Sequence, residues 1–585
     1  MKLDITLRKG RPSKKLYARM CAYYKNVEKG SGFITLEWKR WTGNPDIVVY
    51  AASADHEAAG WIVYNTDTST IEEILATERW RGKGIEAKMV DALIVKENLV
   101  SAETLNADEG KYRWMVEYGF RPVRTQDTGG LLLRKLELST SVLFRRLAGM
   151  KPYKPYLKKE RVVIEKIPEA QSESEIKDGL KNLIGKLGGL DKFVKKGQTV
   201  AIKPNLVSDH GMQDGVYKGG IVTDVRLVRA LIELLLPVAG KIIISEGSSI
   251  NRSATQKMFA LYGYDRLVDM EPGKISLVDL NTDRLVEKAV PRGKRMSARK
   301  IPITLEEADV VINVPVLKMH FAAGVSLSVK SLQGAVPPLE KYMSHFFGLW
   351  QCLVNIHHLV RPDLIIIDGL TGQEDFGPVS GIPKKMDLLI GGTNPVAVDA
   401  VAMKIMGLDP AMSPPVWMAY MQGLGPVEPE RITVVGPPVS EVESAFKIPV
   451  INIGGGRDIV VHEGNACSGC RGYLHFVLNK LRRSDPQDAG RLLIDRPFDK
   501  KVHIYLGPDT EGEIDPGAKN IFMGVCQQHN AGMGMPLQGC PPHAEVIMNG
   551  IFSLFPDVER PKYADETEEA KLEKMLKEVL QKSSS

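Results

Sequence analysis

Short apolar runs alternate with amphipathic stretches over much of this 585-residue chain. The runs at 199–207 and 241–247 flank an amphipathic segment at 224–240, which is the order strand, helix, strand. This order is typical of βαβ units, in which the strands lie parallel. Further runs of the same kind lie at 308–318, 362–369 and 386–392. The pattern predicts a largely parallel α/β sheet in the middle of the chain.

A chain of this length is too long for one core and predicts several domains. Two prolines among lysines and aromatics mark residues 149–160 as a linker. The pattern changes again near residue 440, beyond which glycines and cysteines become more frequent. We therefore expect a multidomain α/β protein with a mixed-sheet N-terminal domain at 1–148, a central domain at 161–440 and a cysteine-rich α/β domain at 441–585.

Charge and composition narrow the function classes. The 77 Lys and Arg residues against 71 Asp and Glu give a net charge of only +6, which does not support nucleic-acid binding. No apolar run is long enough to span a membrane, and the basic start has no apolar stretch behind it. We expect a cytoplasmic protein, and clustered cysteines in that reducing compartment usually bind metal.

A glycine-rich turn lies between a predicted strand at 71–76 and a helix that opens at Ile85. Glycines at such a turn bring backbone amides close to an anion at the positive end of the helix. The turn is formed by Arg79, Trp80, Arg81, Gly82, Lys83 and Gly84. A plain strand–helix connection is the simpler interpretation of the same residues.

This R-x-x-G-x-G spacing, with Tyr118-Gly119-Phe120 further on, resembles the acyl-CoA loop of the GNAT superfamily of N-acetyltransferases over about residues 30 to 137. The resemblance implies that Arg79 and the amides of 81–85 bind acetyl-CoA and that Glu72 or Glu73 deprotonates an amine.

The chain departs from the family at two positions, with Met115 where a tyrosine acid is frequent and Asp108 where asparagine is common. Two interpretations stay open: an acetyltransferase with another acid, or a domain that keeps only the fold.

Ionisable residues gather where the strands of the central domain are predicted to end. Ligands bind beyond the carboxyl ends of parallel strands, so these side chains are expected to share a charged crevice. Each alone has a structural explanation, such as a solvated lysine or a helix cap. Together they suit an anionic small molecule, a carboxylate or phosphate. We take Lys203, Lys318, His320 and Asp368 as catalytic candidates and Asn205, Asp224, Glu246, Asn313 and Lys330 as substrate contacts.

The same segments resemble the domain of unknown function 362 (DUF362) family over about residues 160 to 440. The resemblance rests on IKPNLV, INVPVLKMH, VSLSVKSLQG, IIIDGLTG and GGTNPVAVDAVAMKIMG. It implies no settled reaction, but members are often joined to ferredoxin-like iron–sulfur modules. Met319 and Ser331 stand where the family commonly has threonine and asparagine, so substrate contacts there are expected to differ.

Four cysteines in the last domain predict a metal centre. Cys467 and Cys470 form a C-x-x-C pair, 55 residues separate Cys470 from Cys526, and 13 separate Cys526 from Cys540. Glycines beside the ligands and the proline after Cys540 favour a 4Fe-4S cluster over structural zinc, the competing interpretation. The order C-x-G-C, C, G-C-P-P resembles the cluster-binding chain of nickel–iron hydrogenase small subunits and of a respiratory complex I subunit.

The leading hypothesis is an iron–sulfur redox enzyme that acts on an anionic small molecule, exchanges electrons with a redox partner protein, and carries an acetyltransferase-like domain. An N-acetyltransferase with a structural cluster, and a cluster-based sensor or scaffold without turnover, are the alternatives.

Overall fold

The computed structural model describes residues 5–561 except 55, 98–100, 128–129, 131, 153, 249–253, 292–295, 297 and 511–513, and it also describes residue 574. The chain forms two compact units. The first contains residues 1–154, 454–470 and 481–542, and the second contains 155–453, 471–480 and 543–585. Among the described residues, no helix combines the length and apolarity needed to cross a bilayer.

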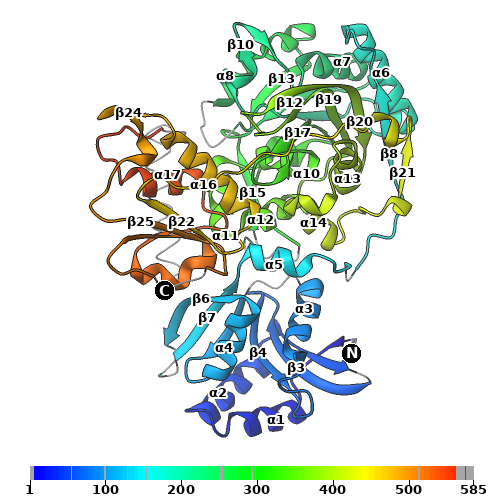
Figure 1. Ribbon diagram of the computed structural model, residues 1–585. Coiled ribbons are helices and arrows are strands. Elements are labelled where there is room, and N and C mark those ends of the chain that lie inside the picture. The colour runs from blue at the N-terminus through cyan, green and yellow to red at the C-terminus, as the bar shows by residue number, and fades with distance from the viewer. Residues whose placement is uncertain are drawn as a thin grey trace. The chain divides into compact units, whose positions relative to one another are not determined.

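The N-terminal part of the first unit is a seven-stranded mixed sheet with strand order β1-β2-β3-β4-β5-β7-β6 (Figure 1). Only β4 and β5 pair in parallel, and the other neighbours are antiparallel. The strands are β1 Ile5–Gly10, β2 Ile47–Ala54, β3 Glu57–Asn65, β4 Thr70–Ala76, β5 Ser101–Leu105, β6 Phe120–Asp127 and β7 Leu132–Leu138. The helices are α1 Lys14–Tyr24, α2 Gly30–Gly43, α3 Ile85–Glu97, α4 Glu109–Tyr118 and α5 Thr140–Leu147.

The cysteine-rich part of the first unit is built on a four-stranded parallel sheet, β22-β25-β26-β27. Its strands are β22 Ile459–Glu463, β25 Val502–Leu506, β26 Lys519–Met523 and β27 Met535–Leu537, with a small hairpin of β23 Ser484–Asp485 and β24 Asp488–Leu492. A 3-10 segment, η8 Val525–Met533, follows β26 directly. Helix α16, Ser468–Leu481, begins in the first unit, and its residues 471–480 belong to the second.

The second unit contains the predicted α/β sheet, with the order β13-β12-β9-β16-β19-β20-β8-β21. Parallel pairing runs from β13 to β19, while β20 is antiparallel to both neighbours, so the sheet is largely parallel as expected. The strands are β8 Glu160–Lys166, β9 Thr199–Pro204, β12 Lys241–Glu246, β13 Ile275–Asp279, β16 Val310–Val314, β17 Val316–His320, β18 Gly324–Val325, β19 Leu364–Glu374, β20 Ile382–Gly392 and β21 Ile432–Val435. Two further pairs are β10 Met212–Gln213 with β11 Val216–Tyr217, and β14 Leu285–Ala289 with β15 Ala298–Pro302.

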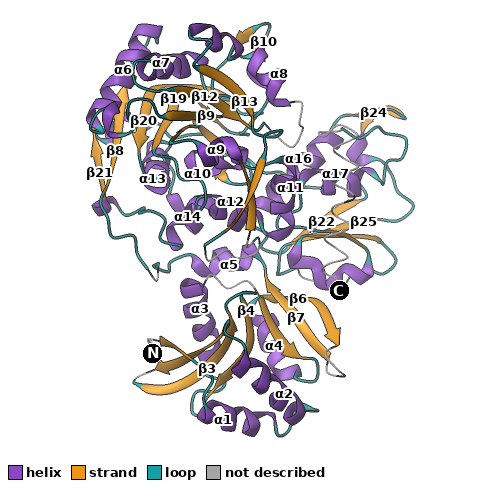
Figure 2. Ribbon diagram, turned by 180° about the vertical axis from the view of Figure 1, so that it is seen from behind, coloured by secondary structure: helices purple, strands orange, loops and turns teal. Residues whose placement is uncertain are grey.

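Helices cover both faces of this sheet (Figure 2). The helices of the second unit are α6 Glu173–Lys186, α7 Val225–Leu235, α8 Ala254–Leu261, α9 Ile303–Glu307, α10 Ser328–Ser331, α11 Pro338–Phe347, α12 Leu349–Ile356, α13 Pro395–Ile405, α14 Pro414–Met421, α15 Val439–Val442 and α17 Ala544–Phe552. The branched strand residues Val200, Ile202, Ile244 and Ile312 are fully buried in one core cluster with leucines of α6 and α7. A sheet buried on both faces explains why the strands read as continuous apolar runs.

Two strands differ from expectation. The run predicted as one strand at 308–318 is split at Pro315, because proline has no N–H to donate to a neighbouring strand. Asp368 was expected at a strand end, but β19 continues to Glu374, since β20 pairs with it along its length. The position predicted for Asp368 was therefore wrong: it lies inside a strand.

Candidate functional site

A cavity of about 1060 Å³ lies in the second unit, beside the ends of the central strands. Four of the predicted residues line it, namely Asn205, Glu246, His320 and Lys330. Its other ionisable lining residues were not predicted: Asp209, His210, Lys257, Lys341, His345, His475, Lys480 and His543. Four lysines and five histidines therefore face two carboxylates, which gives the cavity an excess of basic groups.

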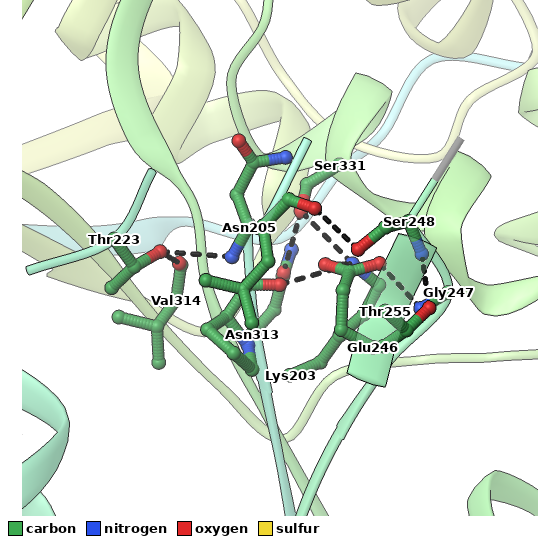
Figure 3. A network of polar contacts seen from close by, with 12 residues as sticks. Lys203, Asn205, Thr223, Glu246, Gly247, Ser248, Thr255, Asn313, Val314 and Ser331 are labelled. Atoms are coloured by element: carbon green, nitrogen blue, oxygen red, sulfur yellow. Dashed lines mark hydrogen bonds and ion pairs between the residues drawn. The ribbon is translucent and has the colours of Figure 1, made fainter. Parts of the chain in front are cut away.

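A buried ion pair joins the ends of β9 and β12 behind this cavity (Figure 3). Lys203 Nζ lies 2.9 Å from Glu246 Oε2, and both side chains are almost fully buried. A Cβ at Gly334 would meet Glu246 Oε1 at 2.0 Å and Lys203 Nζ at 2.9 Å, so only glycine allows this approach. Glu246 is thus shared between the cavity wall and Lys203, which does not line the cavity.

Two more predicted residues bind a neighbouring loop and a neighbouring helix rather than lining the cavity. Lys318 Nζ donates to Asn205 Oδ1 and to the Ile221 carbonyl, each at 2.6 Å, and burial lowers the Lys318 pKa well below its usual value. Asn313 Oδ1 accepts a hydrogen bond from the Ser331 hydroxyl at 3.1 Å (Figure 3). Both side chains are completely buried, and Lys318 in turn orients Asn205, which does line the cavity.

His320 is held in one tautomer by the backbone that follows it. The amides of Ala322 and Ala323 donate to its Nδ1 at 3.1 and 3.2 Å. Burial, with the charges of Lys330 and Lys318, lowers the His320 pKa well below its usual value, so the ring is neutral. A neutral ring that accepts at Nδ1 carries its proton on Nε2. His320 can therefore donate a hydrogen bond to a ligand in the cavity.

Lys341, which is buried, and Lys330, which is half-buried, are two lysines of the cavity wall. Lys330 follows the α10 start, where Asp399 accepts from the amides of Ser328 and Val329 at 2.8 Å. Burial lowers the pKa of Lys330 to about 8 and that of Lys341 to about 7. An anion in the cavity would restore the charged form of both groups.

Most ionisable residues of the wall that sequence reasoning missed lie in helices α11 and α16 or, like His543, directly before α17. Lys341 and His345 are four residues apart in α11, a spacing that puts both on one helical face and could have revealed them. The His345 ring contacts Tyr473 at 5.4 Å and His543 at 4.7 Å between centroids. Stacked Phe321 and Phe476, 5.9 Å apart, add an apolar surface.

Asp224 and Asp368, in contrast, form a separate carboxylate pair that does not line the cavity. Asp224 caps α7 by accepting from the Arg226 amide, as a cap was expected there, and its own amide donates to Asp368 Oδ2 at 2.8 Å. Burial and the charge of Asp224 raise the Asp368 pKa to about 7. Their arrangement ties β19 to the start of α7.

The four predicted cysteine ligands gather in the first unit, and none of the chain's six cysteines, all described, is in a disulfide. A hydrogen bond with Cys470 lowers the Cys467 pKa to about 7, whereas that contact and burial raise the Cys470 pKa. The charges of Cys526 and Cys540 also act on Cys470. Burial followed by the charge of Cys540 raises the Cys526 pKa. Such mutually repelling buried thiols would be stabilised by a cationic metal core.

The surroundings of the cysteines suit a cluster. Gly524 has φ +81°, a backbone conformation that favours glycine, and a Cβ there would lie in van der Waals contact with Cys470 Sγ at 3.4 Å. In the part of the chain that is described, no three His, Cys, Asp or Glu residues are arranged to hold a metal ion. A zinc ion needs thiolates about 4 Å apart, from Zn–S bonds of about 2.3 Å. A four-iron core is wider and holds its thiolates further apart.

The glycine-rich loop of the N-terminal part lies between β4 and α3, and α3 begins at Ile85 as predicted. Gly82 and Gly84 have φ of +69° and +72°, and a Cβ at either would meet nothing within 4 Å. The loop therefore has the left-handed turns that favour glycine and open space beside its amides.

The cations of this loop lie at its edge. Arg79 pairs with Glu57 in an exposed ion pair, Arg81 lies 5.1 Å from the ring centre of Tyr23, and Lys83 is exposed. They could meet the phosphates of a ligand that the loop amides hold.

Glu72 and Glu73 are buried in β4 and already have partners. Glu72 accepts from Arg40, from Trp41 Nε1 at 2.5 Å and from Asn65 Nδ2 at 2.9 Å. Glu73 accepts from Tyr24 and Lys111.

The two positions that depart from the acetyltransferase pattern have structural roles. Met115 is fully buried, and Asp108 caps α4 by accepting from the Lys111 amide at 3.0 Å. The Tyr23 hydroxyl donates to Asp108 Oδ2 at 3.3 Å, so a tyrosine hydroxyl is present near this part of the fold although position 115 lacks one.

Solved structures, a GNAT family acetyltransferase among them, match 23% of the chain. Apo YjaB of Escherichia coli matches 23% of this chain and 97% of its own, with 14% identity and a TM-score of 0.21. A GNAT family acetyltransferase of Elizabethkingia anophelis with acetyl-CoA bound matches 23% and 98%, with 20% identity and a TM-score of 0.17. Scores this low, for under a quarter of the chain, carry no functional weight.

The central region matches the family model described as "Domain of unknown function (DUF362)" at residues 200–404. The thylakoid-associated protein sll1697 of Synechocystis sp. is 30% identical over 287 residues, which are 46% of this chain and 83% of that protein. The aligned region thus covers most of the relative, and the family match falls on the strands that surround the cavity. The chain belongs to the DUF362 family.

Proposed function

We propose that this protein is an iron–sulfur redox enzyme in which a cluster held by Cys467, Cys470, Cys526 and Cys540 exchanges electrons with an anionic small molecule bound in the cavity. The excess of lysine and histidine on the cavity wall supports an anionic ligand. The phenylalanines of the wall would cover an apolar portion of it. A redox partner protein would supply or remove electrons, and we assign the protein to the reducing cytoplasm. The predicted boundaries at 149–160 and near 440 are part of this proposal.

One observation carries the coupling of cluster and cavity. Two cavity-lining residues follow a cysteine by only three positions, Tyr473 after Cys470 and His543 after Cys540. Cys470 and Tyr473 lie in the same helix, α16, where three residues rise about 4.5 Å. Chain connectivity therefore keeps two residues of the cavity wall within three positions of a cysteine.

The residues of the cavity have separable tasks in this proposal. Lys330 and Lys341 would bind the negative groups of the ligand, and His320 would donate from Nε2 without changing its own charge. When bound, the cluster would supply one-electron chemistry. Lys203 and Lys318 would act through the residues they orient, Glu246 and Asn205.

The coupling predicts that reduction of the cluster weakens anion binding. Reduction adds a negative charge near the cavity, which opposes a bound anion. Inorganic pyrophosphate is a suitable probe. Its Kd, measured by anaerobic calorimetry, should be several-fold higher for the dithionite-reduced protein than for the oxidised protein. The Cys467→Ser variant, lacking the cluster, should show no difference between the two conditions. Equal affinity of the oxidised and reduced wild type would refute the coupling.

A second candidate function, acyl-CoA-dependent N-acetyl transfer, is supported by the open glycine turn before α3. The amides of 81–85 would hold the pyrophosphate of acetyl-CoA, with Arg79 beside them. Acetyl transfer to amines that persists in Cys467→Ser would favour an acetyltransferase with a structural cluster. A titration that detects no acetyl-CoA binding would leave this domain with its fold alone.

A further inference from the structure

The first turn of helix α5, which follows the N-terminal sheet, lies against the cysteine site. The Thr140 amide donates to Cys540 Sγ at 3.4 Å, and the Cys540 thiol donates to Thr140 Oγ1 at 2.9 Å. Ser139, which is fully buried and caps α5, forms a side-chain hydrogen bond with Cys526. Two residues of the N-terminal domain thus contact two of the four thiols. Thr140 and Cys540 are 400 positions apart in the sequence.

Strand β6 makes a second contact with the same site. It packs against η8, the segment that carries Cys526. Arg121 of β6 is buried, donates to the Pro508 carbonyl at 2.6 Å, and its positive charge acts on Cys526. The domain contact continues at Ser141, whose hydroxyl donates to the Asn465 carbonyl at 3.1 Å, two residues before Cys467.

We propose that Ser139, Thr140 and Arg121 are positioning residues of the cysteine site, through which the N-terminal domain sets the reduction potential of the bound cluster. This inference rests on the proposed function. Hydrogen-bond donors and positive charge beside a ligand sulfur stabilise the reduced, more negative state of a cluster. Once Cys540 is a thiolate, the Thr140 hydroxyl can also donate to it, so both Thr140 groups would act in the same direction.

This role gives the N-terminal domain a function that needs no acetyl transfer. A domain that supplies contacts to the cysteine sulfurs must keep its sheet and α5. It does not need the tyrosine that acts as an acid at position 115 in the acetyltransferase family. Met115 is compatible with that outcome.

The position of Thr140 allows a sharp test. It is the first residue of α5, where proline is well tolerated because the amide there has no helical partner. Ser139 before it is extended, with ψ 151°, as a residue before proline must be. Thr140→Pro therefore removes both donors, Thr140→Val removes the hydroxyl alone, and Thr140→Ser keeps both as the matched control.

Anaerobic spectroelectrochemical titration of the full chain measures the reduction potential. We expect it to become more negative from Thr140→Ser to Thr140→Val to Thr140→Pro. Loss of both donors should change the ratio of reduced to oxidised cluster about tenfold, which is about 59 mV for one electron. Arg121→Gln should shift the potential in the same direction and serves as a second probe if Thr140→Pro does not fold.

The outcomes separate the inference from the proposed function. Wild-type protein without iron and sulfide would overturn the proposed function. A folded Thr140→Pro or Arg121→Gln variant that keeps its iron but has the wild-type potential would overturn the inference alone.

Discussion

The cysteine site and the cavity differ in the kind of ionisable group that is in excess: acidic thiols at the first, and basic lysines and histidines at the second. The cysteine site brings together four thiols whose ionised forms repel one another, with Arg121 as a nearby cation. The cavity holds lysines and histidines in excess over Asp209 and Glu246. The surplus has opposite sign in the two regions, and it agrees with the proposal that the cysteines hold a cationic core and the cavity an anion.

The buried glutamates of the N-terminal domain sharpen this contrast. Glu73 is matched by Lys111 and Glu72 by Arg40. Arg40 also pairs with Glu37 and Lys111 with Asp108, so the carboxylates of this network have partners within the domain and contribute to its fold. In the other two regions groups of one kind outnumber those of the other, and the functional sites proposed there are based on that surplus.

The largest expected effect is on stability, at the buried ion pair of Lys203 with Glu246. Glu246→Leu leaves Lys203 buried without its carboxylate and should lower the free energy of unfolding by about 3–5 kcal/mol. The double variant Lys203→Met with Glu246→Leu should recover most of that loss. Urea unfolding followed by tryptophan fluorescence measures both.

The exposed pair of Arg79 with Glu57 provides the matched control. Both side chains are more than half exposed, so Arg79→Ala should cost about 1 kcal/mol or less. If Glu246→Leu were no more destabilising than Arg79→Ala, the buried pair would not have the role given to it here.

The next effect is on anion affinity. Lys341→Met or Lys330→Met removes a lysine from the cavity wall, and a hydrogen bond to a charged group contributes about 1.5–3 kcal/mol. The Kd for pyrophosphate should therefore rise by about 10- to 150-fold. Lys257→Met is the control, since Lys257 is largely exposed and paired with Asp209. Equal losses in all three variants would indicate non-specific attraction instead of a defined site.

A smaller effect follows from pH. Burial lowers the pKa of Lys341 to about 7 and of Lys330 to about 8, and the protonated forms bind the anion. Affinity for pyrophosphate should fall as pH rises from 6 to 9. The free energy of unfolding depends on pH in the opposite direction. Above pH 7 the unfolded chain still binds protons that these lysines have lost in the folded chain, so their contribution to stability rises with pH. Calorimetry at several pH values that gave a constant or rising affinity would contradict this assignment.

Much of the fold could be predicted from the sequence. The continuous apolar runs predicted a largely parallel sheet, and the glycine turn before Ile85 marked the start of α3. The order of motifs identified the family. Each of these signals depends on residues close together in the chain, so it can be recognised in a single sequence.

The site was predicted only in part, because its walls come from distant segments. Tyr473 and His543 were not predicted to line the cavity because they lie close to the cysteines in the sequence. Lys341 was not predicted because it lies in a largely apolar helix. Asp368 was misplaced because a strand's end depends on its partner, here β20. The contact of Thr140 with Cys540 has no sequence signal, since a helix start near a thiol depends on tertiary packing.

The most direct test of the account is the metal content of the wild-type protein. Anaerobically purified full-length chain should contain about four iron and four sulfide per molecule, with the broad visible absorption of a 4Fe-4S cluster. Cys526→Ser should lose most of both. Stoichiometric zinc without sulfide, or no metal after anaerobic preparation, would contradict the central claim.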